Sequence, residues 1–325
     1  MRLHYWATAE GNFGDDLNLW LWDFLLPGWR DWDPTVTLVG VGTILSAPQL
    51  DADGNQRYLV VGSGQGNGAP PDFSRNAWDI RAVRGPRSAR ALGLPAHAAT
   101  IDPAAMIPDM EDFASPETSG GPVVVPHFSS LRRYDWKAIC DALEISLVSP
   151  EDEARSVIAR IAAAPLVLAE SMHAAILADA FRVPWIAFSA SPHFDHDKWG
   201  DWADSIDLDL RVHRLFPEID RATRLLGKGG YRPTTHEGTG VQAPAAGPLP
   251  PLMPGTPPPP QVERDPKPHR KAPKTTMRLR YETLMIVSRL RRAMKATPQL
   301  SSDAALAAAK TRLQRQLDTV RQDYG

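Results

Sequence analysis

Residues 166–189 read LVLAESMHAAILADAFRVPWIAFS, two short apolar runs with a helical stretch between them. The runs LVLAES and PWIAFS have the length and composition of buried parallel strands. The Ala-rich stretch from His173 to Phe181 predicts a helix. A buried strand, a helix and a second buried strand form the repeating unit of a doubly wound α/β sheet.

The same alternation runs from the amino terminus to about residue 240. Further strands are predicted at the apolar runs LHYWA, TVTLVGV, YLVVGSG, GPVVVPH and ISLVS. Further helices are predicted at residues 16–26, 86–92, 134–143 and 150–163. For the last of these we expect Ser149 as the N-cap and Pro150 at the first helical position. The fold class is therefore predicted to be α/β.

The length of 325 residues allows two domains at roughly 100 to 200 residues each. The α/β part exceeds one small Rossmann unit, and a polar stretch near Pro126–Arg133 separates two strand-rich parts. We therefore predict two Rossmann-like domains, residues 1–128 and 129–240, that face a cleft. Ligands of such sheets bind beyond the carboxyl ends of the strands, so residues that follow strands are the candidates for chemistry.

The last part of the chain differs in composition. Twelve of the 31 prolines lie between residues 241 and 274, so residues 241–275 predict an extended linker. Residues 276–325 predict two helices, with Ser301 or Ser302 as the N-cap of the second. From residue 262 onward 15 Lys and Arg face 6 Asp and Glu, whereas 21 and 32 precede them. This basic tail favours an anionic surface as partner, or is a solvated face; nucleic acid is not expected, because only Tyr281 interleaves its arginines.

Composition excludes several classes of protein. The chain is 43% hydrophobic and 23% charged, as in ordinary globular proteins. Its single cysteine, Cys140, excludes an intramolecular disulfide framework and suits a reducing compartment. We find no secretory signal and no uninterrupted apolar run of about 18 residues. A cytoplasmic protein is expected.

The first candidate site is the turn GNFGDD, residues 11–16, between the first strand and a helix. Glycines such as Gly14 allow a ligand to approach the backbone closely, and Asn12 is a polar neighbour. Asp15 and Asp16 either cap the helix or accept a proton from a sugar hydroxyl.

The second candidate site is the cluster Arg81, Arg84 and Arg87, just before a helix that begins near Pro86. Guanidinium groups at such a place suit phosphate or carboxylate. The third is the segment Glu170, Ser171, Met172 and His173, which follows a buried strand. A histidine there lies in the predicted cleft, where its ordinary titration range suits proton transfer. His127 has a similar position after the run GPVVVP.

Cofactor signals are weak. The sequence has neither a GxGxxG fingerprint with its acidic partner nor a Walker A motif. His193, Asp195 and His196 cluster in a stretch that is interpreted as a loop, and no distant third ligand is identifiable. No metal or cofactor is therefore expected.

The chain resembles the polysaccharide pyruvyl transferase family, most closely its bacterial exopolysaccharide branch. The resemblance runs from the first strand to about Leu210 and depends on the order of several motifs. These are GNFGDDLN, VGVGTILS, VGSGQG, VRGPRSARALGLP, IDPA, VPHFSS, LVSPED, LVLAESMHAAILADAFRVPWIAF and KWGDWADSIDL.

This resemblance implies a glycosyltransferase-B-like pair of Rossmann-like domains, with the acceptor on the first and the donor on the second. It implies transfer of a carboxyethylidene group from phosphoenolpyruvate, as donor substrate, to two hydroxyls of one sugar, with release of phosphate. Acceptors in this branch are usually lipid-linked oligosaccharides at the cytoplasmic face of the membrane. The basic tail would then contact the membrane surface, or would pack back onto the first domain.

By resemblance, His173 contacts phosphate or transfers a proton, Arg84 binds phosphate or carboxylate, and Asp15 lies near the acceptor. Many relatives outside this branch carry Arg at the position of Ser171. The cation that replaces it is Arg81, Arg87 or Arg132, and no sequence argument selects among them.

Two alternatives to this function stay open. The first is a nucleotide-sugar glycosyltransferase of the same fold, in which an acidic residue such as Glu170 would clamp the ribose. The second is a non-catalytic, membrane-associated scaffold of polysaccharide synthesis.

Overall fold

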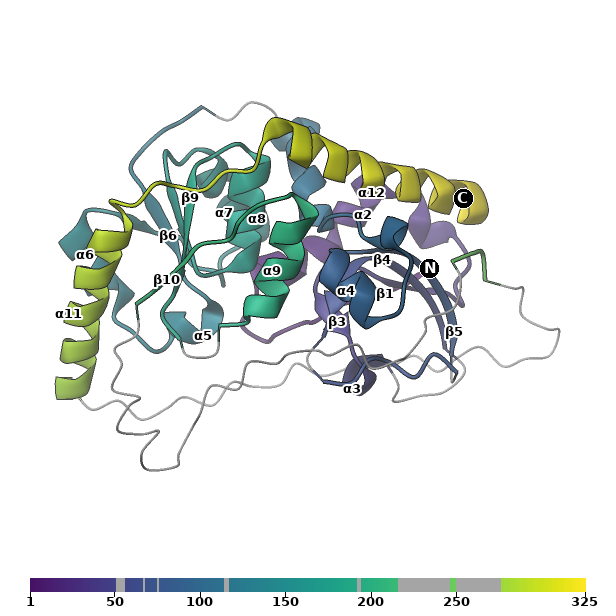
Figure 1. The fold of residues 1–325 in the computed structure, drawn as a ribbon, viewed down its shortest axis with the longest axis horizontal. Coiled ribbons are helices and arrows are strands. Elements are labelled where there is room, and N and C mark those ends of the chain that lie inside the picture. The colour runs from purple at the N-terminus through teal and green to yellow at the C-terminus, as the bar shows by residue number, and fades with distance from the viewer. Residues whose placement is uncertain are drawn as a thin grey trace.

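The computed structural model describes residues 1–50, 56–66, 68–74, 76–113, 117–191, 194–215, 246–249 and 276–325 (Figure 1). Most of the predicted linker, residues 241–275, lies outside them. The described strands form two five-stranded sheets, and every strand pairing within them is parallel. The predicted α/β class is confirmed. We call residues 1–113 the first half and residues 117–215 the second half.

The first sheet consists of β1 (Arg2–His4), β2 (Thr37–Val39), β3 (Thr43–Leu45), β4 (Arg57–Gln65) and β5 (Ala77–Val83). The long strand β4 pairs with β2, β3 and β5, and β1 pairs with β2. Strand β5 was not predicted, because Asp79 and Arg81 interrupt its apolar pattern. In the structure these two buried residues form an ion pair with each other.

The second sheet has the strand order β10-β9-β8-β6-β7. Its strands are β6 (Val123–Val125), β7 (Ser146–Leu147), β8 (Val167–Ala169), β9 (Trp185–Ser189) and β10 (Val212–Arg214). Every one of them except β10 lies in a predicted apolar run. Strand β6 precedes the predicted boundary at residue 128 and pairs with β7 and β8, while the boundary itself stays a prediction.

The helices of the first half are short. They are α1 (Phe13–Asp16), η1 (Leu17–Leu19), α2 (Leu21–Leu25), η2 (Trp29–Asp31), α3 (Ala47–Leu50), α4 (Pro86–Ala91), η3 (Ala96–Ala98), η4 (Pro103–Asp109) and η5 (Glu111–Phe113). The helix predicted at residues 16–26 is in fact three pieces, because α1 passes into the 3-10 turn η1 at Leu17 and the chain then leaves the helical conformation at Trp20, whose φ is −140°.

The helices of the second half are α5 (Phe128–Leu131), α6 (Trp136–Leu143), α7 (Ala154–Ala162), α8 (Met172–Ala180) and α9 (His196–Ser205). The predicted N-cap of α7 at Ser149 is wrong. The Glu153 carboxylate accepts hydrogen bonds from the amides of Arg155 and Ser156, whereas Ser149 Oγ accepts from the Glu151 amide in the preceding turn. The interpretation of residues 191–197 as a loop is wrong at the end of this segment, because α9 begins at His196 with Asp195 as its N-cap.

Helix α8 joins the two halves. All nine of its residues are buried, since it packs against β8 and β9 of the second sheet and against η4 of the first half. A helix that is apolar on every side must be covered on every side. Helix α9 likewise packs against α4 of the first half. The halves therefore meet along α8 and α9, and several of the candidate side chains lie at this junction.

The predicted helical tail is confirmed as α11 (Thr276–Ala293) and α12 (Asp303–Tyr324), and the α12 N-cap is Ser302. Helix α11 packs on α6 through Ile286, Val287 and Leu290. Helix α12 lies across both halves along the top of Figure 1 and buries Leu313 and Leu317 in the main core. Of the alternatives for the tail, α12 packs back onto the fold. Within the described part of the chain, no helix has the length and apolar composition needed to cross a bilayer.

Candidate active site

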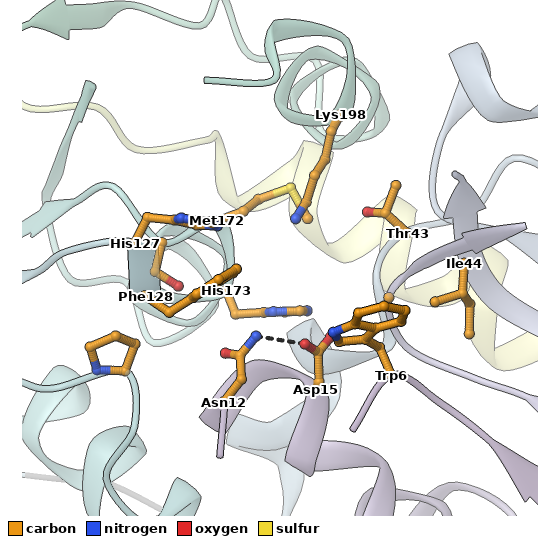
Figure 2. A pocket seen from close by; sticks show the side chains of 13 residues that line it. Trp6, Asn12, Asp15, Thr43, Ile44, His127, Phe128, Met172, His173 and Lys198 are labelled. Atoms are coloured by element: carbon orange, nitrogen blue, oxygen red, sulfur yellow. Dashed lines mark hydrogen bonds between the residues drawn. The ribbon is translucent and has the colours of Figure 1, made fainter. Parts of the chain in front are cut away.

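A pocket lies where the two halves meet (Figure 2). The first half lines it with Trp6, Asn12, Asp15, Gly42, Thr43 and Ile44. The second half lines it with His127, Phe128, Pro150, Ser171, Met172, His173 and Lys198. Most of these residues follow a strand or begin a helix, as expected for parallel sheets.

The turn at residues 11–16 carries two carboxylates, Asp15 and Asp16, which make different contacts. Asn12 is the N-cap of α1, and Asp16 Oδ2 accepts a hydrogen bond from the Asn12 amide at 3.1 Å. Asp15 faces the pocket and accepts a hydrogen bond from Asn12 Nδ2 at 2.5 Å. Burial raises the pKa of Asp15, against the opposing effects of His173 and Lys198. Of the two roles that the sequence left open, the local capping contact belongs to Asp16, and Asp15 remains available to a ligand.

His173 is the second residue of α8, and its side chain is 8% exposed. The imidazole lies directly over Gly14, where a Cβ atom would come within 2.0 Å of Nδ1. Gly14 therefore admits the histidine ring between the halves, a different use from the approach of a ligand that the sequence suggested. Figure 2 shows the ring beside Asp15.

The other predicted residues of this segment divide into two groups. Ser171, Met172 and His127 line the pocket. Glu170 does not, because its buried carboxylate accepts hydrogen bonds from the His127 amide, the Ala190 amide and Ser130 Oγ at 2.7–3.1 Å. Burial raises the pKa of Glu170 to about 7, despite these hydrogen bonds. Glu170 thus connects the loops that follow β6, β8 and β9.

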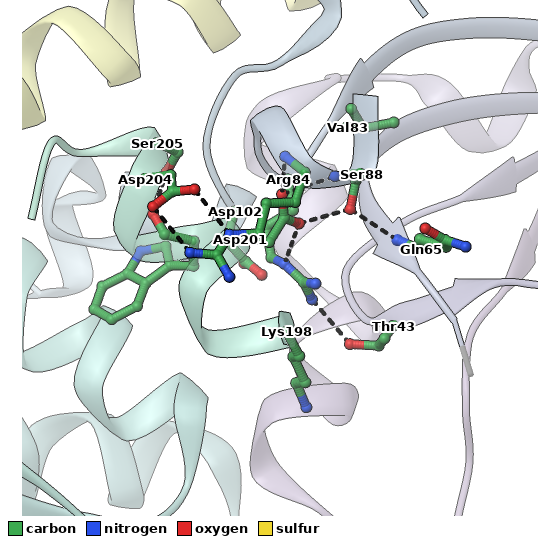
Figure 3. Close-up of polar contacts among 12 residues, drawn as sticks. Thr43, Gln65, Val83, Arg84, Ser88, Asp102, Lys198, Asp201, Asp204 and Ser205 are labelled. Carbon is green, nitrogen blue, oxygen red and sulfur yellow. Dashed lines mark hydrogen bonds and ion pairs between the residues drawn. The ribbon is translucent and has the colours of Figure 1, made fainter. Parts of the chain in front are cut away.

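The three predicted arginines are not brought together. Arg84 is 1% exposed and lies behind the pocket wall, where it donates to Asp201 Oδ2 at 3.2 Å and to Thr43 Oγ1 at 2.8 Å (Figure 3). Arg81 pairs with Asp79 and with Asp323 of α12. Arg87 pairs with Asp204 at the surface. None of the three lines the pocket.

Arg132, the remaining candidate for the replacement cation, is engaged as well. Its guanidinium pairs with Glu10 at 3.2 Å and with Glu151. The sequence-based candidates Arg81, Arg87 and Arg132 therefore all have carboxylate partners outside the pocket.

Lys198 is the pocket cation that sequence reasoning missed. It lies on the first turn of α9, and Figure 2 shows its side chain entering the pocket from above. We find no hydrogen bond or ion pair of its ammonium group with any residue that the structure describes. Burial and the nearby Arg84 lower the pKa of Lys198, and Asp15 opposes them. The sequence signal was the motif KWGDWADSIDL, whose first residue is Lys198, but it followed a stretch interpreted as a loop.

Metal ligands are not gathered at this site. Among the described residues, no group of three or more His, Cys, Asp and Glu side chains is arranged to hold a metal ion. His193, one of the residues noted in the sequence, lies outside the described residues.

Comparison with known proteins assigns this chain to a family. Residues 72–192 match the family model for polysaccharide pyruvyl transferase. The chain is also 40% identical to the succinoglycan biosynthesis protein ExoV of Rhizobium meliloti (strain 1021), over 100% of both proteins. The chain belongs to the polysaccharide pyruvyl transferase family. The resemblance seen in the sequence is thereby confirmed, and so is the expectation of a transferase.

The polysaccharide pyruvyl transferase match extends from just before β5 to just after β9. It includes His127 and His173, whereas Asp15 and Lys198 lie outside it and are covered only by the full-length relative. No solved structure matches the chain significantly.

Proposed function

We propose that this protein transfers a carboxyethylidene group from phosphoenolpyruvate to two hydroxyls of one sugar. The acceptor belongs to an exopolysaccharide or to its lipid-linked oligosaccharide precursor, and phosphate is released. The two halves form a glycosyltransferase-B-like pair, with the acceptor bound by the first half and the donor by the second. Family membership supports pyruvyl transfer, and the relative's role in succinoglycan biosynthesis supports a polysaccharide acceptor.

One observation carries this proposal. The pocket between the halves holds a carboxylate, an imidazole and an ammonium group, from Asp15, His173 and Lys198. A reaction between an anionic enol phosphate and a sugar needs a cation for the phosphate, an acid for the enol carbon and a base for the hydroxyl. The three side chains supply these groups.

The reaction balances with the groups present. A proton adds to the methylene carbon of phosphoenolpyruvate, and the first sugar hydroxyl attacks the adjacent carbon, which has oxocarbenium character. The C–O bond to phosphate then breaks, and the second hydroxyl attacks the same carbon to complete the ketal. The two hydroxyls lose two protons in total. One proton balances the new methyl group, and the other leaves with the phosphate.

Each pocket residue has a role in this scheme. His173 donates the proton to the methylene carbon or contacts the phosphate. Asp15 accepts the proton of the sugar hydroxyl, for which the raised pKa that burial gives it is suited. Lys198 binds the phosphate or carboxylate of the donor, and Arg84 adds positive charge from behind Thr43.

Lys198 also replaces the arginine that many relatives have at Ser171. Ser171 and Lys198 both line the pocket. Ser171 is the N-cap of α8, whereas Lys198 lies on α9. Because Arg81, Arg87 and Arg132 are bound to carboxylates elsewhere, Lys198 is the cation best placed for this contact.

The alternative of a nucleotide-sugar donor has less support. The pocket volume is about 150 Å³, below the roughly 300–1,000 Å³ of pockets that hold larger ligands. Glu170, the candidate ribose clamp, is buried and already accepts three hydrogen bonds from the protein. A small donor such as phosphoenolpyruvate fits both observations.

Membrane contact is assigned to α11. Its inner face packs on α6, while Tyr281 and Leu284 are 49% and 69% exposed. Arg291, Arg292 and Lys295 are exposed near its end. Aromatic, aliphatic and basic side chains on one helix suit an anionic lipid surface. Binding to vesicles that contain anionic lipid, reduced by Leu284→Glu, tests this part separately from catalysis.

The function is tested by phosphate release from phosphoenolpyruvate with a panel of synthetic glycosides and lipid-linked oligosaccharides. We expect acceptor-dependent release and a mass gain of the acceptor that matches a pyruvate ketal. Lys198→Met should raise the KM for phosphoenolpyruvate at least tenfold, whereas Lys137→Met, a change at an exposed lysine on α6, should not. Absence of release with every acceptor, together with binding of a nucleotide sugar, would favour the glycosyltransferase. A His173→Ala variant that still supports polysaccharide synthesis in cells would favour the scaffold.

A further inference from the structure

Asp102 is a buried carboxylate to which the proposed reaction assigns no role. It is completely buried and precedes η4, where its Oδ1 accepts a hydrogen bond from the Ala104 amide at 3.0 Å. Its second oxygen, Oδ2, is buried without a hydrogen-bond partner among the described residues, and so is Nε2 of His173. These two atoms lie 3.7 Å apart. Asp102 Oδ2 is a hydrogen-bond acceptor, and His173 Nε2 is a donor when it carries a proton. Each atom is therefore a suitable partner for the other.

Buried polar groups without partners are rare, because each leaves the cost of its desolvation uncompensated. A separation of 3.7 Å is too long for a hydrogen bond, and closing it takes less than about 1 Å of movement. Contacts between catalytic groups are often long in the absence of substrate and shorten in the complex. The pair is thus one small displacement from a charge-assisted hydrogen bond.

We propose that Asp102 is a positioning residue that accepts a hydrogen bond from Nε2–H of His173 and reserves Nδ1 for the reaction. This inference depends on the proposed function only in the use that it gives to Nδ1. The position of the other ring nitrogen supports that use, because Nδ1 lies over Gly14, next to Asp15 in the chain, and both Asp15 and His173 line the pocket. A carboxylate behind the imidazole also stabilises its protonated form, which is the form that donates a proton.

The charges around the ring are consistent with this arrangement. Asp102 faces the imidazole from the segment before η4, and Asp15 faces it from α1. Two cations interact with these carboxylates: Lys198 of α9 with both, and Arg84, after β5, with Asp102. Burial alone would raise the pKa of Asp102, but His173, Arg84 and the Ala104 amide together hold it below its usual range. Asp102 is therefore an anion when the ring needs a counter-charge.

The wild-type protein gives the first test. Nitrogen NMR of labelled histidine distinguishes the two neutral tautomers of His173. We expect the proton on Nε2, and a proton on Nδ1 would overturn the inference. This measurement needs neither substrate nor turnover, so it stands even if the proposed function fails.

The second test uses Asp102→Asn, with Asp109→Asn as the matched control. Asp109 lies on η4 and pairs with Lys310 near the surface, so its substitution leaves the ring untouched. In Asp102→Asn, the side-chain amide can donate to Nε2 as well as accept from it, so we expect the Nε2–H tautomer of His173 to lose its predominance. The kcat should fall at least tenfold, while the KM for phosphoenolpyruvate changes much less. A merely structural role would reduce the amount of folded protein without changing the tautomer or the kcat of the folded fraction.

A third variant, Asp102→Glu, retains the carboxylate and should restore the Nε2–H tautomer and part of the kcat. An unchanged tautomer and kcat in folded Asp102→Asn would overturn the inference while leaving the pyruvyl transfer in place. Absence of turnover in the wild type, with the tautomers as expected, would instead reject the proposed function. If neither Asp102 variant folds, the tautomer measured in the wild type decides.

Discussion

Arg84 Nε donates a hydrogen bond to Asp201 Oδ2 at 3.2 Å across a separation of 117 residues in the sequence. Asp201 also accepts hydrogen bonds from the Arg87 amide, the Ser88 amide and Ser88 Oγ at 2.6–2.9 Å. Its carboxylate, 3% exposed, therefore attaches α9 of the second half to the start of α4 in the first half. Because Lys198 lies one turn earlier on α9, the same contact fixes the position of the pocket cation (Figure 3).

Replacement of this carboxylate should be costly. Asp201→Ala leaves the buried Arg84 guanidinium without its carboxylate partner, and we expect the free energy of unfolding to fall by about 3–5 kcal/mol. Asp204→Ala, which removes a half-exposed partner of Arg87, should cost no more than about 1 kcal/mol. Urea unfolding of the two variants measures both values. Equal losses would show that Asp201 has no special part in joining the halves.

Gly14→Ala should impair catalysis more than stability. The added methyl group would lie 2.0 Å from His173 Nδ1, so the ring must move. A misplacement of about 1 Å can lower the rate about 100-fold, and we expect a loss of that size in kcat. Gly121→Ala is the control, because a Cβ there meets no atom within 4 Å. A Gly14→Ala enzyme with wild-type kcat would contradict the placement of His173 at the reacting atoms.

Glu170 should make stability depend on pH. Its pKa is about 7 in the folded protein, above the ordinary value of 4.5 that holds after unfolding. Between these values the folded state retains a proton that the unfolded state has lost, so the free energy of unfolding falls as pH rises from about 4.5 to 7.

The Glu170→Gln variant isolates this contribution. The variant lacks the ionisation, so the difference in unfolding free energy between wild type and variant should decrease with rising pH over the same window. A difference that stays constant with pH would show that Glu170 is ionised throughout. Thermal or urea unfolding at several pH values gives the comparison.

Trp6 should contribute to binding of the sugar acceptor. Its side chain is 36% exposed and lines the pocket from the first half, on the side assigned to the acceptor. An aromatic face packs against the C–H groups of a sugar ring, so Trp6→Ala should raise the acceptor KM by about tenfold, or about 1.4 kcal/mol. The KM for phosphoenolpyruvate should change much less, and Trp6→Phe should retain most of the affinity. An equal rise of both constants would place Trp6 outside the acceptor site.

The parts of the fold that could be predicted from the sequence are those in which the buried residues are consecutive apolar residues. The runs around Val60, Leu168 and Ile186 are continuous apolar segments and are strands in the structure. Strand β5 was missed because the contacts that allow Asp79 and Arg81 to be buried include, besides their own ion pair, Asp323 and the hydroxyl of Tyr324, far away in the sequence. Local composition carries no information about such partners.

The candidate site follows the same rule. Asp15, His127 and His173 follow predicted strands, so their convergence on one pocket could be expected from topology. Lys198 and Asp102 could not be selected in this way, since one depends on how α9 meets the first half and the other on a contact between the halves. The arginines were overrated because sequence does not reveal which cations already have carboxylate partners.

The packing of α12 bears on how the protein is made. Arg81 receives its second carboxylate from Asp323, a residue 242 positions later, and Tyr324 donates a hydrogen bond to the buried Asp79 beside it. During synthesis on the ribosome, the first sheet therefore emerges long before the helix that covers it. Until residues 303–324 have been translated, part of its apolar surface has no cover, which is a condition that favours aggregation. We expect nascent chains of this protein to depend on chaperones, and products truncated before α12 to be cleared rather than to accumulate.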